Sequence, residues 1–427
     1  MAANSTNGSS QRSPVERGSA TEDTVKCETP GLLSRLAHAG KIYTIKGFVA
    51  PMMWMREWKE YFQPPEGGPN IVKTYEPRPT LPVRIFFPAS YDVTSHNPLP
   101  TLFTIHGGGF CLGHVSDDDA WNRAFADENN LLVVALNYSK APGYPFPTAV
   151  HDVEALLLAV LADESIPIDR RPRTASSGLS RTALLGFSAG GNLSLSVSQL
   201  PSVRSHPLAP AAALSVYGVL DLSVPPNEKL ANRPWKPSLP SPRGDSTDGL
   251  VGLAPTFDWT YIPYAHDLRD PLLSPLFAQR ADLPPFIGIV AAELDMLAFE
   301  SWQLACRLAR EGVQSHGGGR NAARQMPDRK SKDAKLRVCG RETEPSARTG
   351  ELEGIAPAEP DERFAFEENW DGGGVKWLLV PDVLHGFDSE GFRALMGGKE
   401  AIADAVVKTK AYTPEVGRWL KDKVWRL

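Results

Sequence analysis

The sequence predicts an α/β fold with a mostly parallel central sheet and helices on both of its faces. Short apolar runs such as NLLVVALNY and PFIGIVAA are continuous, with no polar residue at every second position. Continuous runs are typical of parallel strands, because both faces of such a sheet are buried. Helical patterns separate these runs, and regular alternation of strand and helix favours the same architecture. With 42% hydrophobic and 22% charged residues, the chain can form a sizeable core.

The elements are expected in the following order. Residues 31–79, with the aromatic and Met-rich stretch GKIYTIKGFVAPMMWMREWKEYF, predict a packed N-terminal helix or cap element. The α/β domain is assigned to residues 80–313 and 363–427. Its expected strands are LPVRIFF, LPTLFTI, NLLVVALNY, RTALLGF, AAALSVYG, PFIGIVAA and VKWLLV. Its expected helices are TAVHDVEALLLAVLADE, GGNLSLSVSQL and FESWQLACRLAREG.

Three segments lack any periodic apolar pattern. Residues 1–30 are rich in Ser, Thr, Gly and charge and predict a disordered tail. Residues 224–252 are dense in Pro, Ser and Gly and predict a long excursion, with a place in a lid as one possibility. Residues 314–362 are polar and predict a disordered insertion. A real insertion and a retained intron read through as protein are both open explanations for this last segment.

Charge and composition exclude several classes of function. A formal net charge of -5 and a pI near 6.0 give no basic footprint for nucleic acid. The N-terminus lacks the apolar core of a secretory signal, and no run approaches the length of a transmembrane segment. The four cysteines show no CxxC pair and no metal-ligand spacing, which suits a reducing compartment. We therefore expect a cytoplasmic protein with unpaired thiols.

A candidate nucleophile lies between a predicted strand and a predicted helix. Residues 186–190, Gly-Phe-Ser-Ala-Gly, fit the pattern G-x-S-x-G. In that context a sharp strand-to-helix turn raises the hydroxyl of Ser188 above the sheet, and small flanking residues let chain segments approach each other. The helix N-terminus adds backbone donors where negative charge develops. The alternative is a Ser-Gly turn that only caps a helix, which leaves an upstream glycine triplet unexplained.

That triplet, Gly107 to Gly109 in TIHGGGFCLGH, has a matching interpretation. Glycine backbone can bend so that successive N–H groups face a substrate with no side chain between them. Donors directed at a developing oxyanion contribute about 3 to 4 kcal/mol each. We expect the donors to be Gly107, Gly108 and Ala189, with His106 holding the loop; a simple turn after a strand is the alternative.

These motifs resemble the hormone-sensitive-lipase-like branch of the α/β-hydrolase superfamily, whose signature pairs an HGGG loop with GxSAGG. LNYSKAPGYPFPTAVHDVEALLLAV and RDPLLSPLFA resemble further family motifs. The matches cover roughly residues 80–310 and 375–395. Where the family has an arginine after the tyrosine, this chain has Ser139 and then Lys140. The resemblance implies an α/β-hydrolase fold with a helical cap.

A serine hydroxyl needs a base to remove its proton, and the base needs a partner that fixes its tautomer. Of the four histidines downstream of Ser188, only His385 follows a late apolar strand; the others are His206, His266 and His316. A loop after the last strand is expected to lie beside the nucleophile. The resemblance agrees, since His385 begins the family's HGF motif. A surface loop histidine is the alternative.

Two carboxylates at the end of strand PFIGIVAA are candidates for the orienting acid, Glu293 and Asp295. The family places its aspartate in a D-x-L pattern, which Asp295 matches, so the resemblance favours Asp295 with Glu293 as the fallback. Asp382 is interpreted as a loop or capping residue, and Asp152 as a helix anchor. The interval from Asp295 to His385 is about three times that expected from the family.

The leading hypothesis is a carboxylic ester hydrolase, esterase- or lipase-like, that acts on a small-molecule ester through an acyl-enzyme. It needs no cofactor and no metal. Cys111 is interpreted as a packing residue, not a second nucleophile. The aromatic residues of MMWMREWKEYF and FDWTYIPYAHD are expected to form either a pocket wall or cap core. The rival hypotheses are a small-molecule receptor and an adaptor protein, each on a hydrolase scaffold with little turnover.

Overall fold

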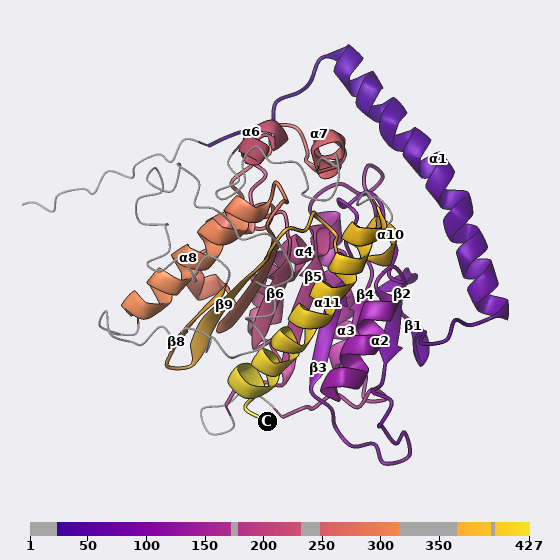
Figure 1. Ribbon diagram of the computed structural model, residues 1–427, viewed down its shortest axis with the longest axis vertical. Helices are drawn as coiled ribbons and strands as arrows, with labels where there is room; N and C mark the ends of the chain where they lie inside the picture. Colours follow the sequence, from indigo (N-terminus) through magenta and orange to yellow (C-terminus); the bar gives the residue numbers. More distant parts are fainter. Residues whose placement is uncertain (1–23, 172–177, 232–247, 316–364, 394–397) are drawn as a thin grey trace, which may run out of the picture.

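A nine-stranded sheet forms the centre of the computed structural model, which describes residues 24–171, 178–231, 248–315, 365–393 and 398–427 (Figure 1). The strand order is β1-β2-β4-β3-β5-β6-β7-β9-β8. The six strands from β4 to β9 in this order pair in parallel, and antiparallel pairs occur only toward the two edges. The predicted α/β fold is confirmed. The strands are β1 (Ile71–Tyr75), β2 (Arg78–Phe86), β3 (Thr101–Ile105), β4 (Leu132–Leu136), β5 (Thr182–Phe187), β6 (Ala212–Val216), β7 (Phe286–Ala292), β8 (Ala365–Trp370) and β9 (Gly373–Val380).

Helices cover both faces of the sheet, as the sequence predicts. Helices α3, α4 and α8 contribute apolar side chains to one core cluster, and α2 and α11 to a second cluster on the opposite face. The described helices are α1 (Leu32–Phe62), α2 (Asp119–Asn129), α3 (Thr148–Ala162), α4 (Ala189–Ser198), α5 (Pro201–Arg204), α6 (Pro226–Ala231), α7 (Leu250–Tyr261), α8 (Ala298–Ser315), α10 (Glu390–Arg393) and α11 (Lys399–Trp419), with short turns Pro275–Phe277 and Arg280–Asp282 and a π-helical end Leu420–Trp425.

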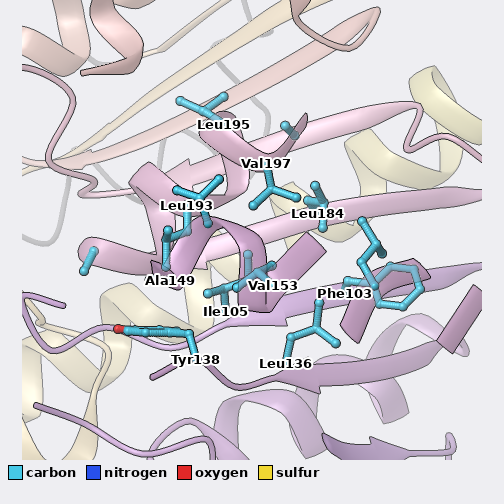
Figure 2. Close-up of a cluster of buried hydrophobic side chains, with 14 of the residues drawn as sticks. Phe103, Ile105, Leu136, Tyr138, Ala149, Val153, Leu184, Leu193, Leu195 and Val197 are labelled. Carbon is cyan, nitrogen blue, oxygen red and sulfur yellow. The ribbon is translucent and has the colours of Figure 1, made fainter. Parts of the chain in front are cut away.

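Strand residues alternate between the two clusters because successive side chains point to opposite faces of a sheet. In β3, Phe103 and Ile105 belong to the first cluster, whereas Leu102 belongs to the second. Figure 2 shows Phe103 and Ile105 among side chains of α3 and α4, including Val153 and Leu193. Both clusters are apolar, which explains why the central strands lack a polar side chain at every second position.

Several elements differ from the sequence-based expectation. Strand β1 (Ile71–Tyr75) pairs with β2, so the sheet includes part of the segment assigned to the cap. The edge strand β8 and the helices α2 and α11 were not expected from the apolar runs, because their exposed faces carry many polar residues. Of the expected tail 1–30, residues 1–23 lie outside the described residues, whereas residues 24–30 are described and the Cys27 N–H donates to the His266 carbonyl at 2.9 Å. Residues 316–362 of the segment 314–362 also lie outside the described residues. No helix in the described part of the chain has the length and apolarity needed to cross a membrane.

Helix α1 is formed as predicted, but it is not packed as predicted. Its single buried residue is Ile42. Trp54, Trp58 and Tyr61 are 61%, 59% and 81% exposed, so they form neither a pocket wall nor cap core. The expectation was wrong because the aromatic side chains lie on the face of the helix that points away from the protein. The second aromatic stretch does enter the core, where Phe257 and Tyr261 of α7 are buried.

Candidate active site

Ser188 lies on the sharp turn between β5 and α4. Its backbone has φ 54° and ψ -116°, in the left-handed half of φ space that side chains with a Cβ rarely adopt. Gly186 and Gly190 make the turn possible, because a Cβ at Gly186 would overlap the Gly190 carbonyl and a Cβ at Gly190 would overlap the Ile105 carbonyl. Ser188 is only partly buried. Its hydroxyl is therefore held above the carboxyl end of β5, within reach of a small molecule.

The structure brings His385 and Asp295 to this hydroxyl. The distance from His385 Nε2 to Ser188 Oγ is 2.8 Å, and the distance from His385 Nδ1 to Asp295 Oδ2 is 2.7 Å. Asp295 follows β7 and His385 follows β9, while Ser188 follows β5. Parallel strands present their carboxyl ends at one edge of a sheet, so these three loops meet there.

Hydrogen bonds fix the orientation of the acid and define the state of the imidazole. The Leu297 N–H donates to Asp295 Oδ1 at 2.9 Å, and Asp295 is fully buried. The geometry suits a neutral imidazole whose Nδ1–H donates to Asp295 and whose Nε2 accepts from the Ser188 hydroxyl. Burial lowers the pKa of His385, but the charge and hydrogen bond of Asp295 outweigh it, so the pKa lies above its ordinary value. The site can thus accept a proton from Ser188 and stabilise the resulting imidazolium.

The glycine loop passes directly beside the nucleophile. A Cβ on Gly107 would lie 3.3 Å from the Ser188 Cβ, and a Cβ on Gly108 would overlap the Leu112 carbonyl. Gly108 and Gly109 have φ of 116° and 58°, which glycine adopts without strain. Among the described residues, the backbone N–H groups of Gly107, Gly108 and Ala189 donate no hydrogen bond within the protein. Gly107 thus lies beside Ser188, Gly108 follows it in the loop, and Ala189 is the residue after Ser188.

The buried side chain of His106 contacts the backbone of this loop. His106 stacks on Tyr138 with ring centroids 4.4 Å apart, and its Nδ1 lies 2.7 Å from the Gly107 carbonyl oxygen. Lys140 Nζ lies 3.0 Å from His106 Nε2 and over the Tyr138 ring. Burial and the charge of Lys140 lower the pKa of His106 well below its usual range. A neutral His106 accepts from Lys140 and donates to Gly107, as expected for a residue that holds the loop.

The other candidates from the sequence do not reach the imidazole. Glu293 accepts a hydrogen bond from the Asp382 N–H at 2.8 Å, so it fixes the loop that precedes His385. Asp152 pairs with Arg78 and accepts from the Ser139 N–H at 2.8 Å, as an anchor of α3 would. His206 and His266 bond to groups elsewhere, Leu208 N and Asp270 Oδ2, and His316 lies outside the described residues.

Sequence reasoning missed a buried network behind His385. The Asp388 carboxylate accepts hydrogen bonds from the hydroxyls of Tyr217 and Tyr412. The Tyr217 ring meets the His385 ring edge-on, with centroids 4.9 Å apart. Burial raises the pKa of Asp388, and the two hydroxyls partly offset that effect. The short interval from His385 to Asp388 was the available signal, but no spacing in the sequence indicated Tyr217 or Tyr412.

Sequence reasoning also missed Asp248, which lies close to the acid. Its carboxylate accepts from the Met296 N–H at 2.9 Å, next to Asp295. Burial and the charge of Asp295 raise the pKa of Asp248 to about 6. Asp248 lies within the Pro-, Ser- and Gly-rich segment 224–252, so no strand or motif marked it.

Cys111 is buried beside the loop, and its Sγ lies 2.6 Å from Thr260 Oγ1 of α7. Burial raises the pKa of the thiol to about 11, so little nucleophilic thiolate forms near neutral pH. Across the described ranges, no group of three or more His, Cys, Asp or Glu side chains is placed to hold a metal ion.

The fold and this edge of the sheet define the class of the α/β hydrolases. Residues 102–317 match the family described as alpha/beta hydrolase fold. The chain belongs to the hormone-sensitive-lipase-like family of α/β hydrolases.

Curated relatives are similar over about half of the chain. An arylesterase of Saccharolobus solfataricus is 30% identical over 239 residues, which are 55% of this chain and 68% of that protein. The carboxylesterase NlhH of Mycobacterium tuberculosis is 31% identical over 245 residues, 56% of this chain and 68% of that protein. Among solved structures, an esterase from Pyrobaculum calidifontis shares the fold with a TM-score of 0.56 and 18% identity, over 92% of this chain and 98% of that one.

Proposed function

We propose that the chain is a carboxylic ester hydrolase in which Ser188 is the nucleophile, His385 the general base and Asp295 the orienting acid. The observation that carries the proposal is the unbroken set of contacts from Ser188 Oγ to His385 Nε2 at 2.8 Å and from His385 Nδ1 to Asp295 Oδ2 at 2.7 Å. Family membership and the ester-hydrolysing names of the relatives support the same reaction class.

The reaction follows from these contacts. Ser188 Oγ attacks the ester carbonyl carbon while its proton passes to His385 Nε2. The tetrahedral intermediate collapses, the alcohol leaves with the proton from His385, and the acyl group stays on Ser188. Water then gives a proton to His385 and attacks the acyl-enzyme, which releases the carboxylic acid and restores Ser188. Asp295 holds the imidazole tautomer and stabilises its charge in both steps.

The backbone N–H groups of Gly107, Gly108 and Ala189 are proposed to form the oxyanion hole. They donate no hydrogen bond within the described part of the protein, and Gly107 lies beside Ser188. Ala189 is the first residue of α4, where the helix dipole favours negative charge. A preorganised donor of this kind stabilises the transition state by about 3 to 4 kcal/mol. The substrate is a small-molecule ester, and no step of the reaction requires a cofactor.

Fluorophosphonate labelling tests the nucleophile. A fluorophosphonate probe should label the wild-type chain at Ser188, and Ser188→Ala should lose both the label and the hydrolysis of nitrophenyl esters. Ser198→Ala is the matched control, because Ser198 lies in the same helix and donates to the Leu195 carbonyl at 2.7 Å. A wild-type chain that binds ester analogues but neither labels nor turns over would instead be a receptor on a hydrolase scaffold.

We also propose that residues 80–313 and 363–427, joined by β1, form the catalytic domain, and that the segment 314–362 is an insertion outside the chemistry. Helix α8 extends to Ser315, so a clean deletion removes residues 316–362. The deleted chain should keep its turnover of nitrophenyl esters. The chain would instead be an adaptor if the wild type binds a partner without hydrolysing esters and the deleted chain no longer binds that partner. A chain-length series of nitrophenyl esters, with an anilide beside it, would define the acyl preference.

A further inference from the structure

Helix α1 directs its apolar face away from the protein. With about 100° of rotation per residue, one half of the helix contains Leu33, Leu36, Tyr43, Phe48, Trp54 and Trp58. Every residue on that half is exposed and none is charged. Leu33, Phe48 and Trp54 are 83%, 74% and 61% exposed. A continuous exposed apolar face of this size marks an interaction surface.

Polar contacts on the opposite half fix this orientation. All the charged residues of α1 lie there, and several bind the body of the protein. Lys46 donates to the Ala141 carbonyl, Arg56 lies 2.7 Å from Asp117, and Glu60 pairs with the buried Arg84. An apolar face turned outward costs free energy in water, so a partner surface is needed to cover it.

Aromatic rings contact one another at the C-terminal end of α1. Ring centroids are 6.0 Å apart for Trp54 and Trp58, and 4.9 Å apart for Trp58 and Phe62. Trp and Tyr prefer the headgroup level of a bilayer, where one end of the ring is apolar and the other is wet. Figure 1 shows α1 running along one side of the molecule, so the whole helix can meet a flat surface.

The charge of α1 selects the kind of surface. The helix has five basic and two acidic residues, a net +3, whereas the rest of the chain has 40 basic and 48 acidic residues, a net -8. Lys41 donates to the Gly252 carbonyl of α7, and the exposed Lys59 lies at one border of the apolar face, where a long basic side chain reaches lipid phosphates. Two copies of α1 face to face would bring two positive helices together, while anionic headgroups complement the charge.

We propose that the outward face of α1 binds the surface of an anionic lipid bilayer, with the helix lying in the plane of the interface. Helix α7 connects α1 to the active site, because it contacts both α1 and the glycine loop. His38 stacks on Trp259 of α7 at 5.8 Å, and the Phe257 ring of α7 fills the space beside Gly109. If the chain is the ester hydrolase proposed above, this placement brings its active site to the bilayer surface, and esters dissolved in the bilayer are the substrate class.

Vesicle flotation with the full-length protein tests the proposal. The wild type should float with vesicles of phosphatidylcholine and phosphatidylserine, less with phosphatidylcholine alone, and less again at high salt. The variant Trp54→Glu/Trp58→Glu should lower the bound fraction at least about tenfold, because it places two charges in the apolar face. Val407→Glu, at a site 50% exposed on α11, is the matched control and should float like the wild type.

Two further measurements separate the possible failures. Sedimentation without vesicles should show the same oligomeric state for the wild type and the double variant. A wild-type dimer that dissociates in the double variant would show that a second copy covers the face, and it would overturn the proposal. Failure of the wild type to float with vesicles would also overturn it. Both proteins should hydrolyse a water-soluble nitrophenyl ester equally, and only the wild type should hydrolyse a vesicle-bound ester efficiently. Flotation without any ester turnover would refute the proposed function and leave the lipid surface in place.

Discussion

The His385 imidazole lies 2.7 Å from the Asp295 carboxylate, although 90 residues separate the two along the chain. The contact forms because β7 and β9 are adjacent parallel strands, so the loops that follow them leave the sheet side by side. The pairing of parallel strands determines this contact.

Replacing the acid should change both the rate and the pH profile. His385 is active as a base only when neutral, and Asp295 raises its pKa above the ordinary value of a histidine. Wild-type kcat/KM should therefore fall as pH drops through a midpoint above that of an unperturbed histidine. Asp295→Asn should move that midpoint to lower pH and reduce kcat roughly 10³- to 10⁴-fold. The measurement is kcat/KM against pH for both proteins. An unchanged acidic limb in the variant would contradict the assigned pairing.

A methyl group at Gly107 should misplace the oxyanion donors. Its Cβ would lie 3.2 Å from the Phe187 carbonyl oxygen and 3.3 Å from the Ser188 Cβ, so the loop must move away from the nucleophile. We expect Gly107→Ala to lower kcat about 100-fold with a smaller change in KM. Gly391→Ala is the control, because a Cβ there has open space. The measurement is kcat and KM for a nitrophenyl ester in the wild type and both variants. A kcat of Gly107→Ala equal to that of the wild type would exclude this loop from the oxyanion hole.

Lys140 should make the stability depend on pH. Burial lowers the pKa of Lys140 to about 7, whereas the pKa of a lysine in the unfolded chain is about 10.4. Between these values the unfolded state binds the proton and the folded state does not, so the free energy of unfolding rises with pH. Lys140→Met should remove about 1 to 2 kcal/mol of the rise between pH 7 and 9, as measured by urea unfolding. The exposed Lys410→Met should keep the wild-type slope; the same slope in Lys140→Met would refute the prediction.

The network behind His385 should contribute to stability. Tyr412 donates to the buried Asp388 carboxylate and accepts from Trp121 Nε1 at 3.0 Å. Tyr412→Phe leaves both partners without this group, so the free energy of unfolding should fall by about 1 to 3 kcal/mol. Tyr144→Phe, at a site 56% exposed, should have no measurable effect. Equal unfolding curves for Tyr412→Phe and the wild type would show that the network is dispensable.

Cys111 should be inert toward thiol reagents and dispensable for turnover. It is buried and its thiol has a pKa of about 11, so iodoacetamide at pH 8 should modify it far more slowly than it modifies a small free thiol. Cys111→Ala should keep ester hydrolysis close to the wild-type rate. Mass spectrometry follows the modification. Loss of turnover in Cys111→Ala, with the fold intact by circular dichroism, would reopen a role for the thiol in catalysis.

The sequence by itself determined the fold class and the local turns. Continuous apolar runs indicated the buried parallel strands, and the glycines around Ser188 and in the HGGG loop indicated backbone that a Cβ would obstruct. Both signals are local, because burial on two faces and positive φ each constrain the residue type at the position itself. The assignments of Ser188, His385 and Asp295 to catalysis, and of the glycine loop to the oxyanion, remain predictions.

Only the tertiary structure decided what these elements meet. The carboxylates Glu293 and Asp295 are two residues apart after the same strand, and the fold alone directs Asp295 to His385 and Glu293 to the Asp382 N–H. The Tyr217–Asp388 contact and the outward face of α1 likewise depend on partners far away in sequence. An amphipathic pattern specifies that a helix has an apolar face, but the contacts of its other face determine which way that apolar face points.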